Sequence, residues 1–324
     1  MHFNYLIEKV RSARVYEYPF PHIHIKEFFE ADDFAAIVKS PYINIEKQQC
    51  NRELIDTLFA RGYKVEDFPG STRNYAKYLE HQARGRALPS RNTTASEGLT
   101  LRLYEFCPVL RELNNFITSR PFNAAIASRF DINLEQCRID AGIQKYLDGY
   151  EISPHPDVRL KAATFMVNIN PHTNSETQRH HTTYLRLKPE YRYVQEFWEN
   201  HLDAERQWIP WDWCESVFTQ NLNNSIVIFA PGNDTLHAVK AHYNHLLGQR
   251  TQLYGNLWYI ESKTRYAPSW EQLSDKNFVP PSNFYSTLQS AAEYLKKSVR
   301  AYLIHGKTDP NVGTRKGFDE RTKR

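Results

Sequence analysis

Residues 144–170 read QKYLDGYEISPHPDVRLKAATFMVNIN, and this stretch decides the fold. Runs rich in β-branched and aromatic residues lie on both sides of an Asp148-Gly149 turn and of a His-Pro-Asp segment. Short runs of this kind, bounded by turn-forming residues, are typical of β-strands. The stretch therefore predicts a strand, a turn, a His-x-Asp segment and a returning strand.

The same pattern continues on both sides of this stretch, from Cys137 to Tyr259. The runs that we expect to be strands are Cys137–Leu147, Ala162–Asn170, Thr182–Leu187, Ser225–Phe229, Thr235–Lys240 and Arg250–Ile260. Turn-forming residues such as Pro231-Gly232 separate most of them, whereas residues 189–206 lack alternation and predict a helix. Several strands with turns between them favour a sandwich or barrel, so the fold class is mainly β with flanking helices (α+β).

The flanking regions predict helices that cover this core. A strand is expected at His22–Lys26, with helices at Asp32–Lys39, Glu53–Arg61, within Arg111–Phe130 and at Thr287–Ile304. The polar segment Pro69–Arg102 is expected to run over the surface. We expect one domain, 1–324, divided into an N-terminal helical and strand cover (1–135), the core (136–262), a C-terminal helical cover (263–305) and a flexible basic tail (306–324).

Composition excludes several classes of protein. The chain has 324 residues, 41% of them hydrophobic, and a net charge of +4 with a pI near 8.7. Its basic residues are scattered except at the tail, so no nucleic-acid partner is expected. No apolar run approaches the length of a membrane span, and the four cysteines form no CxxC pair. These features predict a cytoplasmic protein.

The His-Pro-Asp segment is a candidate metal site. A His-x-Asp pair alone is a weak signal, and a second one occurs at His201 and Asp203. Residues i and i+2 face the same side only on extended chain, and the second pair lies in a segment expected to be helical. His155 and Asp157 flank Pro156, which favours extended backbone before it. Their side chains can converge on one ion.

A third ligand and an anion-binding residue are expected further along the chain. His237 follows the Pro231-Gly232 turn in a short strand, and Arg250 opens the next strand. A hairpin with its turn at residues 244–248 would bring Arg250 alongside His237. Two imidazoles and one carboxylate leave open positions on a metal, and a guanidinium can hold a carboxylate in bidentate fashion. The pattern therefore indicates a metal that also binds a dicarboxylic acid.

In these residues the sequence resembles the prolyl-4-hydroxylase-like branch of the 2-oxoglutarate/iron(II)-dependent oxygenases. The resemblance covers roughly residues 137–260, through Tyr146, Gly149, His155, Asp157, Lys161 and Thr164, the segment NSIVIFAPGNDTLHAVK and the segment R-x-QLYGNLWY. It implies a double-stranded β-helix (jelly-roll) core. It also implies that His155, Asp157 and His237 bind Fe(II), and that Arg250 holds 2-oxoglutarate with contributions from Tyr146, Thr164 and Lys161. A HHTTYLRL segment departs from the family pattern, so the resemblance does not indicate the substrate.

The function implied is a 2-oxoglutarate-dependent dioxygenase that uses O2, with ascorbate as a possible helper. It would hydroxylate an unactivated C–H bond of a small or carrier-bound substrate and convert 2-oxoglutarate to succinate and CO2. The aspartate ligand favours hydroxylation, since halogenating relatives lack this carboxylate. Alternatives are a metal-dependent jelly-roll isomerase or hydrolase, and a non-enzymatic jelly-roll module that binds sugars or peptides. Oligomeric state is not readable.

Other residues have ordinary structural interpretations at this stage. Lys161 is interpreted first as a solvated strand end. His180 and His181 are adjacent, so on a strand they point to opposite sides and do not form a second metal site. The tryptophans of QWIPWDWCES, Trp208, Trp211 and Trp213, are expected to pack as core residues. The basic tail is expected to be solvated.

Overall fold

The structure is a computed structural model that describes residues 2–85, 88–89 and 96–261. The helix predicted at Thr287–Ile304, the C-terminal helical cover and the basic tail lie outside the described residues. No helix in the described ranges is both long enough and apolar enough to cross a membrane.

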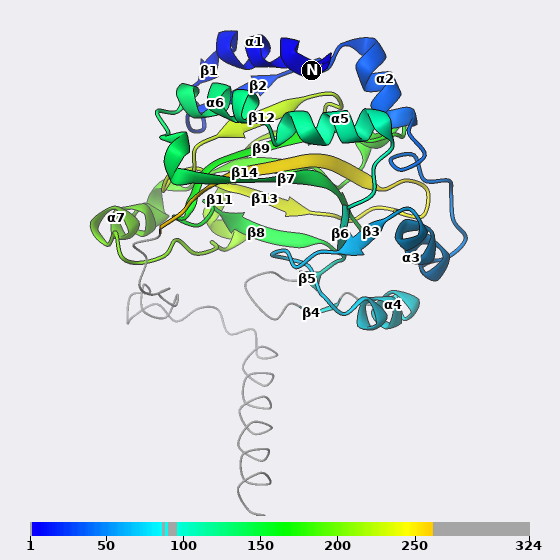
Figure 1. Cartoon of the computed structure of the whole chain (residues 1–324). Coiled ribbons are helices and arrows are strands. Elements are labelled where there is room, and N and C mark those ends of the chain that lie inside the picture. The colour runs from blue at the N-terminus through cyan, green and yellow to red at the C-terminus, as the bar shows by residue number, and fades with distance from the viewer. Residues whose placement is uncertain (1, 86–87, 90–95, 262–324) are drawn as a thin grey trace, which may run out of the picture. The chain divides into compact units, whose positions relative to one another are not determined.

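Two antiparallel sheets form a sandwich (Figure 1). The larger sheet has the strand order β1 (Val15–Tyr16), β2 (His22–Ile25), β12 (Ile226–Phe229), β9 (Lys161–Asn168), β14 (Arg250–Tyr259), β7 (Cys137–Tyr146), β6 (Thr100–Leu103) and β3 (Tyr63–Val65). The smaller sheet has the order β11 (Cys214–Thr219), β10 (Thr182–Leu187), β13 (His237–Lys240) and β8 (Glu151–His155). A separate pair joins β4 (Leu88–Pro89) and β5 (Ser96–Glu97). The α+β jelly-roll prediction is confirmed.

Helices cover the outer face of the larger sheet, where α1, α5 and α6 lie side by side (Figure 1). The helices are α1 (Tyr5–Ser12), α2 (Ala31–Lys39), α3 (Asn51–Ala60), α4 (Tyr75–Ala83), α5 (Pro108–Ile117), α6 (Arg120–Arg129) and α7 (Tyr193–Asn200). Short 3₁₀ turns occur at His2–Asn4, Leu134–Gln136, Ser175–Thr177, Pro189–Tyr191 and Trp211–Trp213. The Ser119 hydroxyl accepts a hydrogen bond from the backbone amide of Phe122 (3.5 Å), and this cap begins α6.

The core lies on both faces of the larger sheet because its central strands are buried on both sides. In β9, Phe165 and Val167 join the main core with the helices, whereas Met166 belongs to a cluster between the two sheets. Phe122 of α6 packs edge-on against Phe165 at 5.6 Å between ring centroids. Alternation along β9 and β14 therefore gives each strand one face for the helix-covered core and one face for the space between the sheets.

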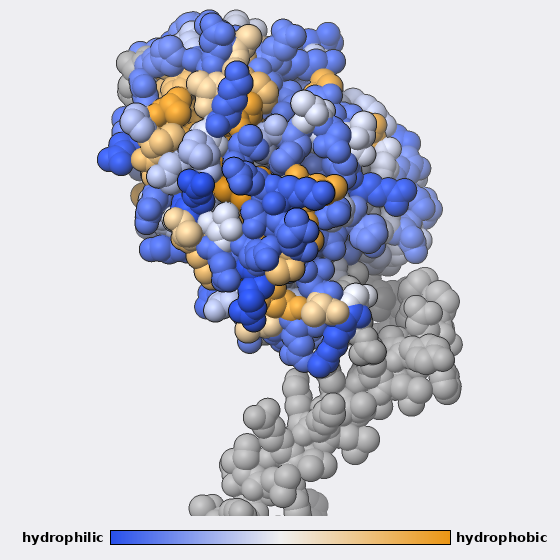
Figure 2. Space-filling model, turned by 90° about the vertical axis from the view of Figure 1, so that its right-hand side faces the viewer, coloured by the Kyte–Doolittle hydropathy of each residue, from blue (hydrophilic) through white to orange (hydrophobic). Residues whose placement is uncertain are grey.

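The outer surface around α3 and α4 is mostly hydrophilic, with hydrophobic residues in small separate groups (Figure 2). Scattered exposed apolar residues are normal for a folded protein and do not by themselves mark an interface. The hydropathy of this face therefore does not indicate a binding surface for another protein.

Three local expectations are wrong. The segment Pro69–Arg102 does not stay on the surface: it contains α4, and its end forms β6 of the larger sheet, where Leu101 is fully buried. Residues 201 and 203 are not helical, because α7 ends at Asn200. The predicted hairpin between His237 and Arg250 does not form, because β13 and β14 belong to different sheets. The N-terminal cover contributes strands β1, β2, β3 and β6 to the larger sheet, while the domain division itself stays a prediction.

Candidate metal and co-substrate site

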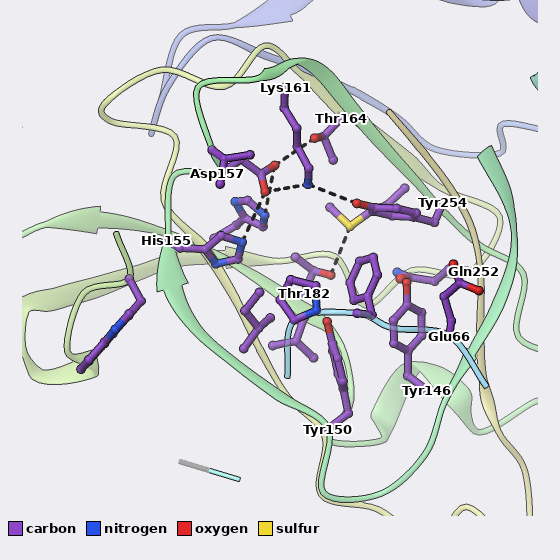
Figure 3. A pocket seen from close by; sticks show the side chains of 18 of the residues that line it. Glu66, Tyr146, Tyr150, His155, Asp157, Lys161, Thr164, Thr182, Gln252 and Tyr254 are labelled. Atoms are coloured by element: carbon purple, nitrogen blue, oxygen red, sulfur yellow. Dashed lines mark hydrogen bonds and ion pairs between the residues drawn. The ribbon is translucent and has the colours of Figure 1, made fainter. Parts of the chain in front are cut away.

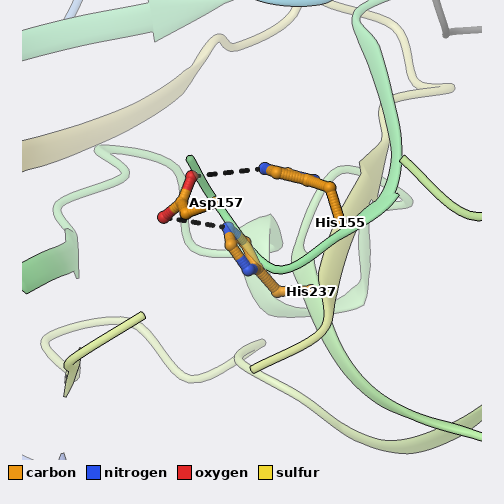
Figure 4. A group of neighbouring side chains, drawn as sticks. All are labelled: His155, Asp157 and His237. Atoms are coloured by element: carbon orange, nitrogen blue, oxygen red, sulfur yellow. Dashed lines mark ion pairs between the residues drawn. The ribbon is translucent and has the colours of Figure 1, made fainter. Parts of the chain in front are cut away.

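Three predicted side chains meet between β8 and β13. His155 ends β8 and is the register partner of His237, which begins β13. Asp157 follows β8 in a left-handed conformation, with φ +60°, that turns its carboxylate toward both imidazoles. One possible ligand atom from each residue lies within 4.8 Å of the others (Figure 4). His155 Nε2 is 3.4 Å from Asp157 Oδ1, and His237 Nε2 is 3.8 Å from Oδ2.

Both imidazoles have the orientation that a metal ligand needs. His155 Nδ1 lies 2.9 Å from the Ser153 carbonyl oxygen, and His237 Nδ1 lies 3.1 Å from the Thr235 carbonyl oxygen. A carbonyl can only accept, so each Nδ1 carries the proton and donates it. Each Nε2 therefore faces Asp157 and is the ring atom placed to bind a metal. Burial and the neighbouring His155 lower the pKa of His237 to about 3, which keeps it neutral.

Asp157 is ionised and firmly held. Its carboxylate accepts hydrogen bonds from Lys161 Nζ at 2.7 Å and from Thr164 Oγ1 at 2.9 Å (Figure 3). Burial alone would raise the pKa of Asp157, but the Lys161 ammonium outweighs it and keeps this pKa well below its usual value. Lys161 also donates to the Tyr254 hydroxyl at 3.1 Å. The interpretation of Lys161 as a solvated strand end is therefore wrong.

Arg250 is the first residue of β14 and is 1% exposed. One terminal nitrogen donates to Thr182 Oγ1 and Gln252 Oε1, both at 3.0 Å. Its Nε and the other terminal nitrogen are buried without a partner, and no carboxylate among the described residues pairs with it. The Tyr146 ring lies against the guanidinium, with 4.6 Å from the guanidinium carbon to the ring centroid. Burial lowers the pKa of Arg250.

These groups line one cavity of about 420 Å³ (Figure 3). This volume is within the range of small-ligand pockets. The predicted residues His155, Asp157, His237, Arg250, Tyr146, Lys161 and Thr164 all line it. The larger sheet supplies Arg250, Tyr146, Lys161 and Thr164, and the smaller sheet supplies His155 and His237. The cavity therefore lies between the two sheets.

Two predicted co-substrate contacts are already engaged within the protein. The Tyr146 hydroxyl lies 2.5 Å from the side-chain amide of Gln144, and an amide orientation in which Gln144 donates to it also allows Gln144 to accept from Arg102. In that orientation the Tyr146 proton is free for a ligand. The Thr164 hydroxyl holds Asp157 instead. Direct contacts of Tyr146 and Thr164 with 2-oxoglutarate stay predictions.

Sequence reasoning missed Gln252 and Tyr254, which line the cavity with Arg250. Residues i, i+2 and i+4 share one face of a strand, so alternation from Arg250 could have identified both. Arg206 and Trp208 also line the cavity, and no local pattern marked them. Among the other tryptophans, Trp211 donates to Glu151 Oε1 at 3.0 Å and Trp213 stacks on Tyr191 at 4.4 Å.

The chain was compared with known proteins in three ways. No family model and no curated protein matches it. Solved structures do match, and the three described below are each 10% identical to this chain. A Pseudomonas putida prolyl-4-hydroxylase is 10% identical with a TM-score of 0.38, covering 80% of this chain and 100% of its own. A Trichoplax adhaerens prolyl hydroxylase, solved with a hypoxia-inducible-factor peptide, is 10% identical with a TM-score of 0.39, covering 80% and 89%.

A third structure, the non-heme α-ketoglutarate-dependent epimerase of nogalamycin biosynthesis, is 10% identical with a TM-score of 0.33, covering 87% of this chain and 93% of its own. The chain is thus similar in structure to several 2-oxoglutarate/iron(II) oxygenases. The name of the third protein gives its reaction as an epimerisation. The reactions and substrates of these proteins are their own and are not transferred to this chain.

Proposed function

We propose that the chain is an iron(II)- and 2-oxoglutarate-dependent oxygenase that hydroxylates a small or carrier-bound substrate. The observation that carries the proposal is the buried Arg250 guanidinium, which has no carboxylate partner among the described residues and shares a cavity with a His-Asp-His cluster. A buried unpaired charge is costly, so its site must receive an anion.

The residues present fit the metal. His155 and His237 each present Nε2 toward Asp157, which offers an ionised carboxylate, and this is the donor set of non-haem iron(II) sites that leave positions open. Lys161 and Thr164 would orient Asp157 through the carboxylate oxygens that face them. These contacts fix the ligand before a metal arrives.

The residues also fit the co-substrate. Arg250 would pair with the distal carboxylate of 2-oxoglutarate through the nitrogens that now lack a partner, and Thr182 holds the guanidinium in place. The Tyr146 hydroxyl would donate a further hydrogen bond. When bound, the two groups supply oxidation of a C–H bond by O2, with conversion of 2-oxoglutarate to succinate and CO2.

The test is anaerobic addition of Fe(II) and then 2-oxoglutarate to the full-length protein. We expect a visible metal-to-ligand charge-transfer band in the wild type and no band in His237→Ala. Arg250→Ala should weaken 2-oxoglutarate binding by about 100-fold, since it removes a charged pair. Arg192→Ala, an exposed arginine beyond the cavity, is the matched control. Folding of each variant is checked by circular dichroism.

The same experiment separates the alternatives. A jelly-roll isomerase or hydrolase would bind metal without any dependence on 2-oxoglutarate, and a sugar- or peptide-binding module would bind neither. A correctly folded wild type without the band contradicts the proposal. Asp157→Gly should lose succinate formation in the presence of O2, so unchanged turnover in that variant would show that the ligand assignment is wrong.

A further inference from the structure

Arg206 is a second buried guanidinium in the cavity wall. It is 7% exposed and lines the same cavity as His155, Asp157 and Arg250. Its Nε is buried without a hydrogen-bond partner, and within residues 2–85, 88–89 and 96–261 its side chain forms no hydrogen bond or ion pair. Burial and the nearby Arg159 lower the pKa of Arg206 to about 10, so it stays charged at neutral pH.

Arg206 belongs to a segment that is fastened beside the triad. Arg159, two residues after Asp157, donates from Nε to the Ala204 carbonyl at 2.7 Å and from a terminal nitrogen to the Trp198 carbonyl at 2.5 Å. Further along, the Ile209 amide donates to the Pro154 carbonyl at 2.6 Å. The backbone that carries Arg206 is therefore tied to the end of β8, which carries His155, and to the loop that follows it, which carries Asp157.

The nearby acidic groups are engaged elsewhere. Glu205 Oε1 accepts hydrogen bonds from the backbone amides of Arg159 and Arg206, both at 2.8 Å, and so supports the turn rather than the guanidinium. Asp157 is held by Lys161 and Thr164. Asp234 affects Arg206 electrostatically but forms no ion pair with it in the described part of the chain. Glu205, Asp157 and Asp234 act on the Arg206 charge electrostatically, but no carboxylate in the described part of the chain forms an ion pair with it.

We propose that Arg206 is the substrate-recognition residue and that the substrate carries an anionic group, a carboxylate or a phosphate, which pairs with it. This inference rests on the proposed function. Arg102 also lines the cavity but is paired with Asp140 and Glu66, and Arg250 is assigned to 2-oxoglutarate, so Arg206 is the guanidinium left for the anionic group of the substrate. The anionic group of the substrate then fixes which of its carbons faces the triad. Rings of Tyr150, Tyr254 and Trp258 also line the cavity and would contact the rest of the molecule.

The experiment measures binding of small aromatic probes to the full-length protein saturated anaerobically with Fe(II) and 2-oxoglutarate, so that the Arg250 site is filled. The probes are phenylacetate, phenyl phosphate and the neutral phenylacetamide, followed by ligand-observed NMR. We expect at least one anionic probe to bind at least 10-fold more tightly than phenylacetamide. Comparison of phenylacetate with phenyl phosphate distinguishes a carboxylate from a phosphate preference.

The preference for an anion should be lost in Arg206→Gln and kept in Arg192→Gln, an exposed arginine at the start of α7. Arg206→Lys should keep part of the preference, which controls for damage to the fold. The inference is overturned if the neutral probe binds as well as both anions, or if the preference survives Arg206→Gln in folded protein.

Two outcomes separate this inference from the proposed function. If Arg206→Gln weakens the charge-transfer band and Arg250→Gln does not, Arg206 holds 2-oxoglutarate and the substrate assignment is wrong. If the wild type gives no band, the proposed function fails. The probe titration in protein without 2-oxoglutarate, repeated in Arg250→Gln, then still tests whether Arg206 selects an anion.

Discussion

Asp157 shows how a few contacts prepare a metal ligand. Its backbone is left-handed, its side chain is buried, and its carboxylate has a cation on one oxygen and a hydroxyl on the other. Lys161 donates to one carboxylate oxygen and Thr164 donates to the other, and each oxygen keeps a second lone pair that can bind a metal.

Thr164 gives a prediction at this scale. Thr164→Val removes the hydroxyl with almost no change of shape, so Asp157 loses one of its two orienting contacts. We expect Fe(II) affinity to fall by about 10-fold, since loss of such a supporting contact typically costs 10- to 100-fold. The measurement is an anaerobic Fe(II) titration. Thr183→Val, which removes a hydroxyl on β10 that is hydrogen-bonded to the Thr219 hydroxyl, is the control. Equal affinities of the two variants would contradict the role of Thr164.

The sequence allowed the triad residues to be predicted, because an extended chain places residues i and i+2 on one side. The structure brings His155 and Asp157 together in another way, since Asp157 follows β8 with φ +60°. It did not reveal what holds the pair. The partnership of Lys161 with Tyr254 joins residues 93 positions apart, and its formation depends on the pairing of β9 with β14. Arg206 shows the same limit, since its burial results from the path of an irregular segment.

Strand β14 is the element that connects the site to the core. It pairs with β7 on one side and β9 on the other, and its alternation directs Arg250, Gln252 and Tyr254 into the cavity. Leu253 and Leu257 point into the helix-covered core. The sequence predicted this strand and its bounds almost completely. It did not predict that β13 and β14 belong to different sheets. The nine residues between these strands could form a hairpin loop or could cross from one sheet to the other.

Gly255 gives the prediction at the scale of this element. A Cβ added at this position would lie 2.0 Å from the Phe165 ring, which is buried against the helices. Gly255→Ala should therefore lower the free energy of unfolding by about 1–3 kcal/mol, the usual cost of overpacking a core. The measurement is urea unfolding followed by circular dichroism.

The control for this prediction is Gly142→Ala on the neighbouring strand β7. The nearest atom to a Cβ there is Arg102 Cδ at 3.3 Å, in a side chain that can move. A loss of stability as large in Gly142→Ala as in Gly255→Ala would show that the close approach of Phe165 is not the cause.

At the scale of the whole molecule, buried histidines make the free energy of unfolding depend on pH. Burial is the largest cause of the low pKa of His181 and His245, each about 4, against a usual value of 6.5. His245 accepts from the Asp148 amide through Nδ1, and its Nε2 lies 2.5 Å from Asn51 Oδ1. The neutral imidazole makes both contacts, and a second proton would break the first. Folding therefore requires these rings to stay neutral.

The sign of the pH dependence follows from proton binding. Between pH 6.5 and 4 the unfolded chain protonates these histidines and the folded chain does not, so the free energy of unfolding falls as the pH is lowered. We expect a loss of about 1–2 kcal/mol for each histidine between pH 7 and pH 5, measured by urea unfolding at both values. His245→Gln should reduce the loss by the share of one histidine, because other histidines with a pKa lowered by burial, His24, His180, His181 and His237, remain. His242→Gln, an imidazole whose side chain is 80% exposed, should leave the loss unchanged. A free energy of unfolding that stays constant from pH 7 to pH 5 in the wild type would contradict this prediction. It would mean that the buried imidazoles take up protons in the folded state, and that the interior around Arg250 is more accessible to water than its packing indicates.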